Sequence, residues 1–265
     1  MPTTYAHYRF GKDVYERLPD SLKESIDEYR GLYDIGLHGP DLLFYYKALT
    51  KNPINQKGFA MHERPGQEFF QAAAPIADAM TDSSPARAYL CGFLCHFALD
   101  SNCHPYVEQM VRETGVTHSA IEAELDRYFM EKDGHDPLSY HPTGHLIACP
   151  FHARVIARFF PGIGNREIET CIRSIRFYCN LLVVPGRFRR TLTYTVMKLG
   201  GCSQSIRDMV IRYQKIPACI PLCIRLEELY QKAVADAVEL IQNFQEYMDG
   251  NSVLDKRLEH TFGEF

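Results

Sequence analysis

Histidine and carboxylate side chains recur at helical spacing between residues 91 and 106 of the chain. His96 and Asp100 are four residues apart, and His104 follows after another four. Residues four apart on an α-helix lie on one face, so the three side chains would form a single row. Zinc accepts imidazole nitrogens together with carboxylate oxygens, and this row supplies both. The spacing therefore predicts a metal-binding helix face.

The same row also has a structural interpretation, in which Asp100 pairs with a histidine inside a helical core. Phe93, Leu94, Phe97 and Leu99 make the segment apolar, and an isolated buried carboxylate there would be costly. Taken alone, the segment favours this structural pairing, so the choice between the two interpretations depends on the rest of the chain.

Five further potential ligands occur in the first half of the chain: His7, Asp41, His62, His118 and Glu122. His118 and Glu122 repeat the spacing of four. Asp41 could merely cap a helix, and Glu122 has the capping-box spacing from Ser119. Eight nitrogen and oxygen ligands are too many for one tetrahedral zinc, and they suit two or three clustered metals with a bridging carboxylate. The full set favours metal binding over structural pairing.

Helices must position these ligands, because the chain shows no run of alternating strand residues and reads as all-α. A helical stretch is predicted over residues 12–29, interrupted at Pro19. A glycine–proline turn then delivers Asp41 to the first turn of a helix over residues 42–48. Residues 51–58 read as a polar loop. The first three ligands thus lie at or near predicted helix ends.

The row of three ligands belongs to a helix that begins near Pro85, because proline is favoured in a first helical turn. Before it, His62 is predicted to open a helix running to about residue 80. Pro105 marks a place where the ligand helix ends or restarts, and Thr117 precedes the next helix. A Gly/Pro/His-rich connection follows at residues 133–145. Further helices are expected at 146–159, 165–183, 187–198, 203–214 and 221–248.

A length of 265 residues allows one large domain or two small ones. We expect a single multi-helix domain over residues 1–265, with the ligands in residues 1–130 and a helical C-terminal half at 140–265. The net charge of −4 gives no strong nucleic-acid signal. No apolar run reaches the roughly 18 residues of a transmembrane segment. No basic region followed by an apolar run opens the sequence, so no signal peptide is expected. Nine scattered cysteines suit reduced thiols, so a cytoplasmic protein is expected.

Several other polar residues have weaker chemical interpretations. His38 could support the site or bind substrate, but an exposed turn histidine is favoured. His141, His145 and His152 could bind another metal, but a solvated loop is favoured. Arg187, Arg189 and Arg190 could hold a phosphate, but a solvated helix face is favoured. His135-Asp136 lies between Gly134 and Pro137 in a turn, which argues against an HD-type phosphohydrolase. Cys91 and Cys95 fit buried thiols better than metal ligands.

The order and spacing of the eight residues resemble the bacterial zinc-dependent phospholipase C family, which is structurally akin to the S1/P1-type zinc nucleases. The resemblance spans roughly residues 5–130. The matching elements are the His7 segment, Gly39-Pro40-Asp41, His62, His96-x3-Asp100, His104 and His118-x3-Glu122.

The resemblance implies an all-helical fold with three zinc ions. One ion would be held by Asp41, His62, His96 and Asp100. A second would be held by His104, His118 and Glu122. A third would be held by His7 and by Asp100, which then bridges two metals. In the secreted phospholipases this third zinc also binds a processed N-terminal tryptophan, whereas this chain has no tryptophan and begins Met1-Pro2.

The resemblance also implies hydrolysis of a phosphodiester by in-line attack of a metal-activated hydroxide, with Asp41 orienting or deprotonating the water. The substrate would be a phospholipid or a related small phosphodiester. Two alternatives are a nuclease or nucleotidase on the same metal scaffold, and a non-catalytic protein whose metals only tie helices together. Two or three zinc ions are expected, although ligand chemistry alone also permits iron.

Overall fold

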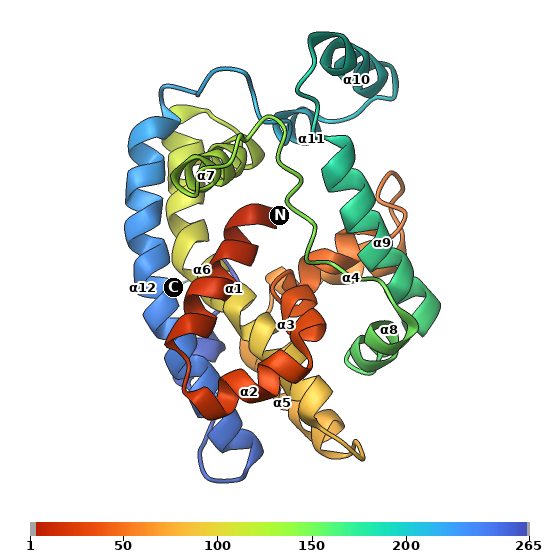
Figure 1. The fold of residues 1–265 in the computed structure, drawn as a ribbon, viewed down its shortest axis with the longest axis vertical. Helices are drawn as coiled ribbons and strands as arrows, with labels where there is room; N and C mark the ends of the chain where they lie inside the picture. The colour runs from red at the N-terminus through yellow and green to blue at the C-terminus, as the bar shows by residue number, and fades with distance from the viewer. Residues whose placement is uncertain (1–3, 264–265) are drawn as a thin grey trace.

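Every regular element in the computed structural model, which describes residues 4–263, is helical (Figure 1). The predicted all-α fold is therefore confirmed. The α-helices are α1 (Thr4–Arg17), α2 (Asp20–Glu28), α3 (Arg30–Gly36), α4 (Pro53–His62), α5 (Gly66–Asp78), α6 (Ser84–Thr114), α7 (His118–Lys132), α8 (Pro150–Ala157), α9 (Asn165–Leu181), α10 (Arg187–Leu199), α11 (Gln204–Asp208) and α12 (Cys219–Met248). Two 3-10 helices, η1 (Gly39–Tyr45) and η2 (Lys256–Glu259), complete the set.

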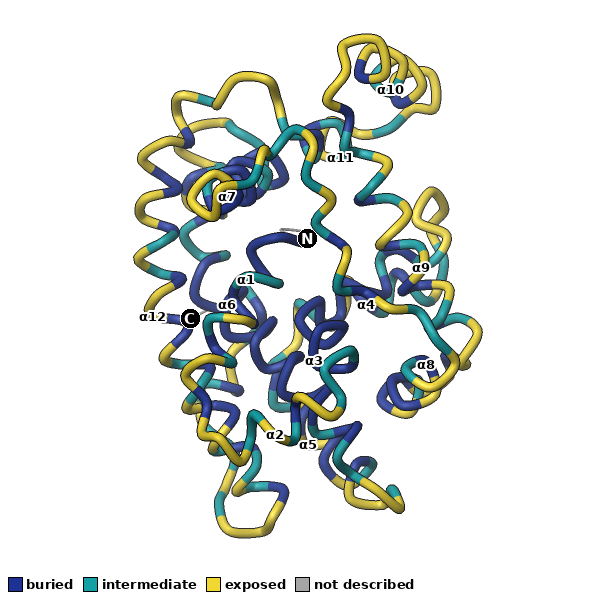
Figure 2. Tube along the Cα trace, viewed as in Figure 1, coloured by how far each residue is buried: buried dark blue, intermediate teal, exposed yellow. Residues whose placement is uncertain are grey.

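Helix α6 lies in the middle of the fold and packs against α1, α3, α7 and α12 (Figure 1). Its residues are buried almost continuously from Pro85 to Cys103, which includes the positions of His96 and Asp100 (Figure 2). One hydrophobic cluster extends from Tyr5 near the start of the chain to Phe262 near its end. The central candidate ligands, His96 and Asp100, are thus carried on an element fixed from several sides by apolar packing.

Pro105 does not end α6, contrary to the sequence-based prediction, and the helix continues to Thr114. A proline inside a helix costs about 3 kcal/mol. Tertiary contacts on both sides of Pro105 offset this cost. Asn102 donates a hydrogen bond to Asp236 on α12, and Val107 is buried in the core.

Two glycines allow α3 and α6 to cross with their backbones in contact. A Cβ atom on Gly36 would lie 2.3 Å from the Tyr89 carbonyl oxygen, and one on Gly92 would lie 2.1 Å from the Tyr33 carbonyl oxygen. Neither position has room for a side chain. This crossing brings the segment after α3, which contains Asp41, against the middle of α6.

The N-terminal elements differ from the sequence-based prediction in three places. The first helix begins at Thr4 and not near residue 12. Residues 53–58 belong to α4 and are not a loop, because Asn52 and Asn55 form a reciprocal capping box at its start. His62 is the last residue of α4 and does not open α5.

Helix α10 protrudes beyond the bundle, with most of its residues exposed (Figures 1 and 2). Its base packs in a small second cluster formed by Val184, Met197 and Val210. The predicted helix at 203–214 is shorter, spanning only Gln204–Asp208. Within residues 4–263, no helix has the length and apolar character needed to cross a membrane. All nine cysteines carry free thiols.

Candidate metal centre

The carboxylate of Asp100 lies at the centre of the eight predicted ligands. Its Oδ1 is 3.2 Å from His7 Nε2 and 3.4 Å from His104 Nε2. Its Oδ2 is 3.1 Å from His96 Nε2 and 3.8 Å from His62 Nε2. Each oxygen therefore faces a different pair of imidazoles, as a carboxylate that bridges two cations would.

Charge balance around Asp100 disfavours simple pairing. Burial alone would raise the pKa of its carboxyl, but the imidazoles of His104 and His96 hold that pKa well below its usual range. The three carboxylates of the ligand groups, Asp41, Asp100 and Glu122, are too few to neutralise five imidazolium ions. The rings of His7 and His96 stack with centroids 4.5 Å apart, so protonating both would bury two like charges in contact. Neutral imidazoles around a shared cation avoid this repulsion.

The first ligand group contains Asp41, His62 and His96, whose ligand atoms all lie within 4.8 Å of one another. Nδ1 of His62 is 2.9 Å from the Gly58 carbonyl oxygen. A carbonyl only accepts, so Nδ1 carries the hydrogen and donates it. The other nitrogen, Nε2, then faces Asp41 Oδ1 at 3.0 Å. A backbone partner that orients the imidazole in this way is typical of metal-binding histidines.

Gly39 lets η1 run directly over the ring of His96. Its φ is +45°, and a Cβ there would lie 2.3 Å from Cδ2 of His96. Pro40 follows in the first turn, and Asp41 comes next with its side chain buried. The sequence predicted an α-helix over residues 42–48, whereas the structure has a tight 3-10 turn that places Asp41 against the ligand helix.

The second ligand group contains His104 from α6 with His118 and Glu122 from α7. Oε1 of Glu122 lies 3.0 Å from His118 Nε2 and 3.6 Å from His104 Nε2. The remaining nitrogen of His118, Nδ1, is 2.7 Å from Glu108 Oε1. Glu108 was not predicted from the sequence, although it lies one helical turn beyond His104. It orients His118 toward the group.

Opposite charges stabilise each other within this second group. Burial alone would lower the pKa of His118, but the carboxylates of Glu122 and Glu108 raise it to about 9. Burial would likewise raise the pKa of Glu122, but the neighbouring His118 lowers it to about 2. Glu122 does not form a capping box with Ser119, because the residue that caps the start of α7 is Thr117.

The third ligand group contains His7, His96 and Asp100. Its position depends on the start of α1, where Asp126 accepts hydrogen bonds from the backbone N–H groups of Tyr5 and Ala6 at 3.3 and 2.9 Å. Asp126 lies one turn beyond Glu122 on α7, so a single helix positions the second group and the start of the helix that carries His7. Met1 and Pro2 lie outside the described residues.

Most of the buried side-chain nitrogen and oxygen atoms that lack a well-aligned hydrogen bond within residues 4–263 belong to the three ligand groups. Those in the groups include His7 Nδ1, His62 Nε2, His96 Nδ1 and Nε2, Asp100 Oδ2, His118 Nε2 and Glu122 Oε2. Buried polar atoms are normally satisfied. Ligands about 2.0–2.1 Å from a tetrahedral zinc lie roughly 3.3 Å from one another. The nitrogen–oxygen separations here are 3.0 to 3.8 Å, so the donor set and its spacing fit zinc.

The weaker sequence candidates fall outside the ligand groups. His38 is buried and is not an exposed turn residue, since its Nε2 lies 2.8 Å from Nε2 of His145. Burial lowers the pKa of His145 to about 3 and that of His38 well below its usual value, so the pair is neutral. His141 is exposed, and His152 contacts the Ile147 carbonyl oxygen. The 141–152 segment forms no metal group.

The remaining candidates also have structural surroundings. Asp136 accepts a hydrogen bond from Ser139 in an exposed turn, away from any candidate metal group. Cys91 and Cys95 are buried, and burial raises the pKa of both thiols. Arg190 is buried and donates to backbone carbonyl oxygens. These residues take no part in the candidate metal centre.

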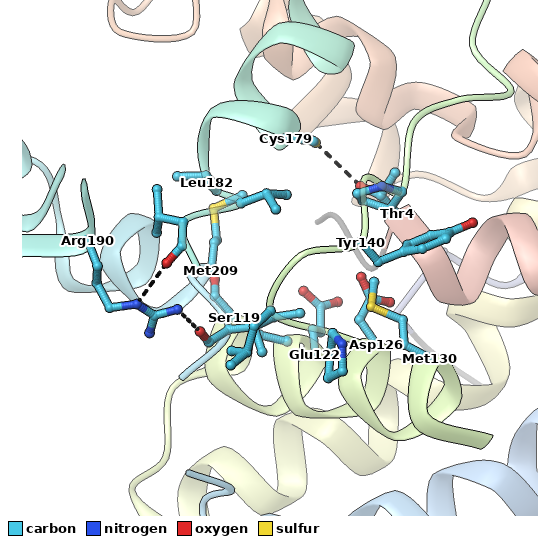
Figure 3. Close-up of a pocket in the computed structure, with 17 residues that line it drawn as sticks. Thr4, Ser119, Glu122, Asp126, Met130, Tyr140, Cys179, Leu182, Arg190 and Met209 are labelled. Carbon is cyan, nitrogen blue, oxygen red and sulfur yellow. Dashed lines mark hydrogen bonds between the residues drawn. The ribbon is translucent and has the colours of Figure 1, made fainter. Parts of the chain in front are cut away.

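A pocket of about 60 Å³ adjoins the second ligand group (Figure 3). Glu122 and Asp126 lie on one side of it, whereas Leu182, Arg190 and Met209 lie on the other. The carboxylate-bearing wall thus belongs to α7, the helix that carries His118 and Glu122. The opposite wall is mainly apolar and comes from the segments that flank α10.

A family model described as zinc-dependent phospholipase C matches residues 6–171, which is more than half of the chain. The matched range contains all eight residues of the three ligand groups. No curated protein and no solved structure shows significant similarity to the chain.

Proposed function

The chain belongs to the zinc-dependent phospholipase C family, and we propose that it hydrolyses the phosphodiester bond of a phospholipid or a related small phosphodiester. Family membership makes it a zinc-dependent hydrolase. The observation that carries the finer proposal is the position of Asp100, whose two oxygens face separate pairs of imidazoles. A bridging carboxylate holds neighbouring metals close enough to grip one phosphoryl group together.

The three ligand groups offer up to three metal positions, and we propose that zinc fills two or three of them. His96 belongs to both the first and the third group, and Asp100 of the third group also faces His62 of the first. The first and third groups are therefore more closely linked to each other than to the second group. The second group has its own carboxylate, Glu122, and its own orienting partner, Glu108. Iron(II) suits the same imidazole and carboxylate donors, so metal analysis must decide between the two metals.

Asp41 is the proposed catalytic residue. Bound zinc would supply Lewis acidity to a water molecule and to a phosphoryl group. Burial alone would raise the pKa of Asp41, but the imidazoles of His62 and His96 help to hold it below its usual range. Such a carboxylate stays ionised at neutral pH, so it can accept a hydrogen bond from water but is a weak base. Its first role is therefore to orient the attacking water.

The pocket beside Glu122 limits which part of a lipid can enter. A volume of about 60 Å³ holds roughly four water molecules. A reacting phosphodiester group fits this space, whereas the acyl chains of a phospholipid do not. We propose that the chains stay outside the pocket, near its apolar wall, while the phosphodiester group reaches the ligand groups.

Hydrolysis of a soluble chromogenic phosphodiester tests the proposal. Zinc-loaded protein should hydrolyse it, chelation should abolish the activity, and added zinc should restore it. Asp41→Asn should lower kcat by roughly 100-fold or more, as loss of a catalytic carboxylate does. Asp20→Asn is the matched control, because the Asp20 side chain is 97% exposed. Equal rates before and after chelation would refute the proposal.

A further inference from the structure

Helix α10 carries an apolar stripe that the fold leaves in solvent. Within the described residues, Phe188, Leu192, Val196 and Leu199 are 81%, 54%, 60% and 83% exposed. Their spacing of four, four and three residues places them on one side of the helix. Isolated exposed apolar residues are common on protein surfaces, but four that follow one helix face form a continuous strip.

The opposite side of α10 already holds the helix to the protein. Met197 is buried against Val184 and Val210. Arg190 donates hydrogen bonds to the carbonyl oxygens of Val184 and Ile211, at 3.2 and 2.7 Å. Packing against the protein therefore does not require the exposed stripe. A helix that is apolar on both sides is expected to contact a second apolar environment.

The charge around the stripe is strongly positive. Residues 170–207 contain seven Lys and Arg residues and no Asp or Glu, in a chain whose net charge is −4. Three of the basic side chains, Arg187, Arg189 and Lys198, are exposed on α10 itself. An apolar helix face edged by Arg and Lys is the pattern of a helix that lies in the surface of an anionic membrane.

The position of α10 links this stripe to the candidate metal centre. The segments on either side of the helix supply Leu182, Val184 and Met209 to the lining of the pocket. Leu182 and Met209 lie across the pocket from Glu122 (Figure 3). The helix that carries the stripe thus adjoins the pocket next to the second ligand group, and its own Arg190 is part of the lining.

We propose that α10 docks the protein on an anionic phospholipid surface, with the four-residue stripe inserted between head groups. The inference extends the proposed function, because acyl chains that remain outside the pocket need an apolar surface nearby. A second copy of the chain fits less well. The helix is about 20 Å long, so a stripe about 10 Å wide offers only about 200 Å², whereas a standard interface buries about 800 Å² per partner.

Sedimentation with sucrose-loaded vesicles tests the docking surface separately from catalysis. The zinc-loaded protein is mixed briefly on ice with vesicles of phosphatidylcholine alone or with 30% phosphatidylserine. We expect stronger binding to the anionic vesicles and weaker binding at high salt. Phe188→Ser with Leu192→Ser should lower the partition coefficient at least roughly tenfold. Arg189→Glu with Lys198→Glu should lower the partition coefficient on anionic vesicles roughly fivefold or more for each basic side chain replaced. The same variant should bind vesicles of phosphatidylcholine alone like the unmodified chain.

Matched controls come from exposed apolar residues elsewhere in the fold. Leu49 and Val253 are 73% and 81% exposed. The Leu49→Ser and Val253→Ser variants should bind vesicles like the unmodified chain. All variants alter exposed side chains, so their unfolding temperatures should match that of the unmodified chain, and hydrolysis of the soluble phosphodiester should be unchanged.

Several outcomes would overturn the docking proposal. The α10 variants could bind anionic vesicles like the unmodified chain, or the Leu49 and Val253 controls could lose as much binding. Light scattering could instead show a dimer that the α10 variants dissociate, which would assign the stripe to a second copy. If vesicle binding depends on α10 but no phosphodiester is hydrolysed, the proposed function fails and the docking surface stands.

Discussion

Glu108 offers a way to weaken one ligand group without touching a proposed ligand. Its carboxylate accepts the hydrogen bond from His118 Nδ1 at 2.7 Å, while Nε2 of the same ring faces Glu122. In Glu108→Ala the imidazole loses the partner that fixes its orientation and its tautomer. We therefore expect zinc to bind more weakly at the second group and normally at the others.

The expected magnitude follows from the position of Glu108. Loss of a partner that orients a metal-binding histidine lowers metal affinity about 10- to 100-fold, which corresponds to about 1.4–2.7 kcal/mol. The Glu108 side chain is 51% exposed, so its pair with His118 should contribute less than about 1 kcal/mol to the free energy of unfolding. Affinity for one zinc should thus change much more than the stability of the metal-free protein.

Competition with a chromogenic zinc chelator measures this difference. The control is Glu113→Ala, which removes another glutamate from the same helix end; its carboxylate contacts only Gln109 among the described hydrogen bonds. One weakened zinc in Glu108→Ala, with unchanged binding in Glu113→Ala, is the predicted result. Unchanged zinc affinity in Glu108→Ala would refute the assigned role of Glu108, as would equal weakening of every zinc.

Three further predictions address the supports of the ligand groups and their charges. Gly39→Ala should lower both zinc content and the unfolding temperature, because its methyl group would collide with the ring of His96; elemental analysis and calorimetry measure the two effects. Asp126→Ala should destabilise the start of α1 by about 1 kcal/mol, measured by denaturant unfolding, and should deplete the third zinc first. In the metal-free protein the pKa of His118 is raised to about 9, so its stabilising contribution is present below its usual pKa of 6.5 and is lost as pH rises through 9. The pKa of Glu122 is lowered to about 2, so its contribution is present above its usual 4.5 and is lost as pH falls through 2. The unfolding temperature of the metal-free protein should therefore fall between pH 6.5 and 9, whereas that of the zinc-loaded protein should not, because zinc binds the deprotonated imidazole.

The candidate ligands could be named from the sequence because the spacing that suggests them is local. The spacing of His96, Asp100 and His104 survives any change in how the helix packs, provided that the helix forms. The same is true of His118 and Glu122. The structure also brings His7, Asp41 and His62 close to the candidate ligands on these two helices. The geometry groups His96 with His7 as well as with Asp41 and His62, whereas the resemblance implied His96 only in the group of Asp41 and His62.

The element boundaries were harder to predict because distant residues decide them. The start of α1 is capped by Asp126, more than one hundred residues away in sequence. The continuation of α6 through Pro105 depends on packing against α12. The α4 boundary was a different kind of error, since Asn52-Pro53 is a helix-start signal that the loop-like composition of the segment concealed.

The surface of α10 shows a third limit of sequence reasoning. The arginines at 187–190 suggested a solvated face, and Arg187 and Arg189 are indeed exposed. Helical spacing alone could not show which apolar stripe faces the protein. Only the packing of Met197 shows that the Phe188 stripe is the one left in solvent.

We propose that Asp100 bridges metals in a cluster. Elemental analysis of protein purified without added metal tests it most directly, in the unmodified chain and in Asp100→Asn. We predict two or three zinc ions per chain, and the loss of at least one in the variant. Fewer than two metal ions in the unmodified chain would contradict the cluster, and full zinc content in Asp100→Asn would contradict the bridge.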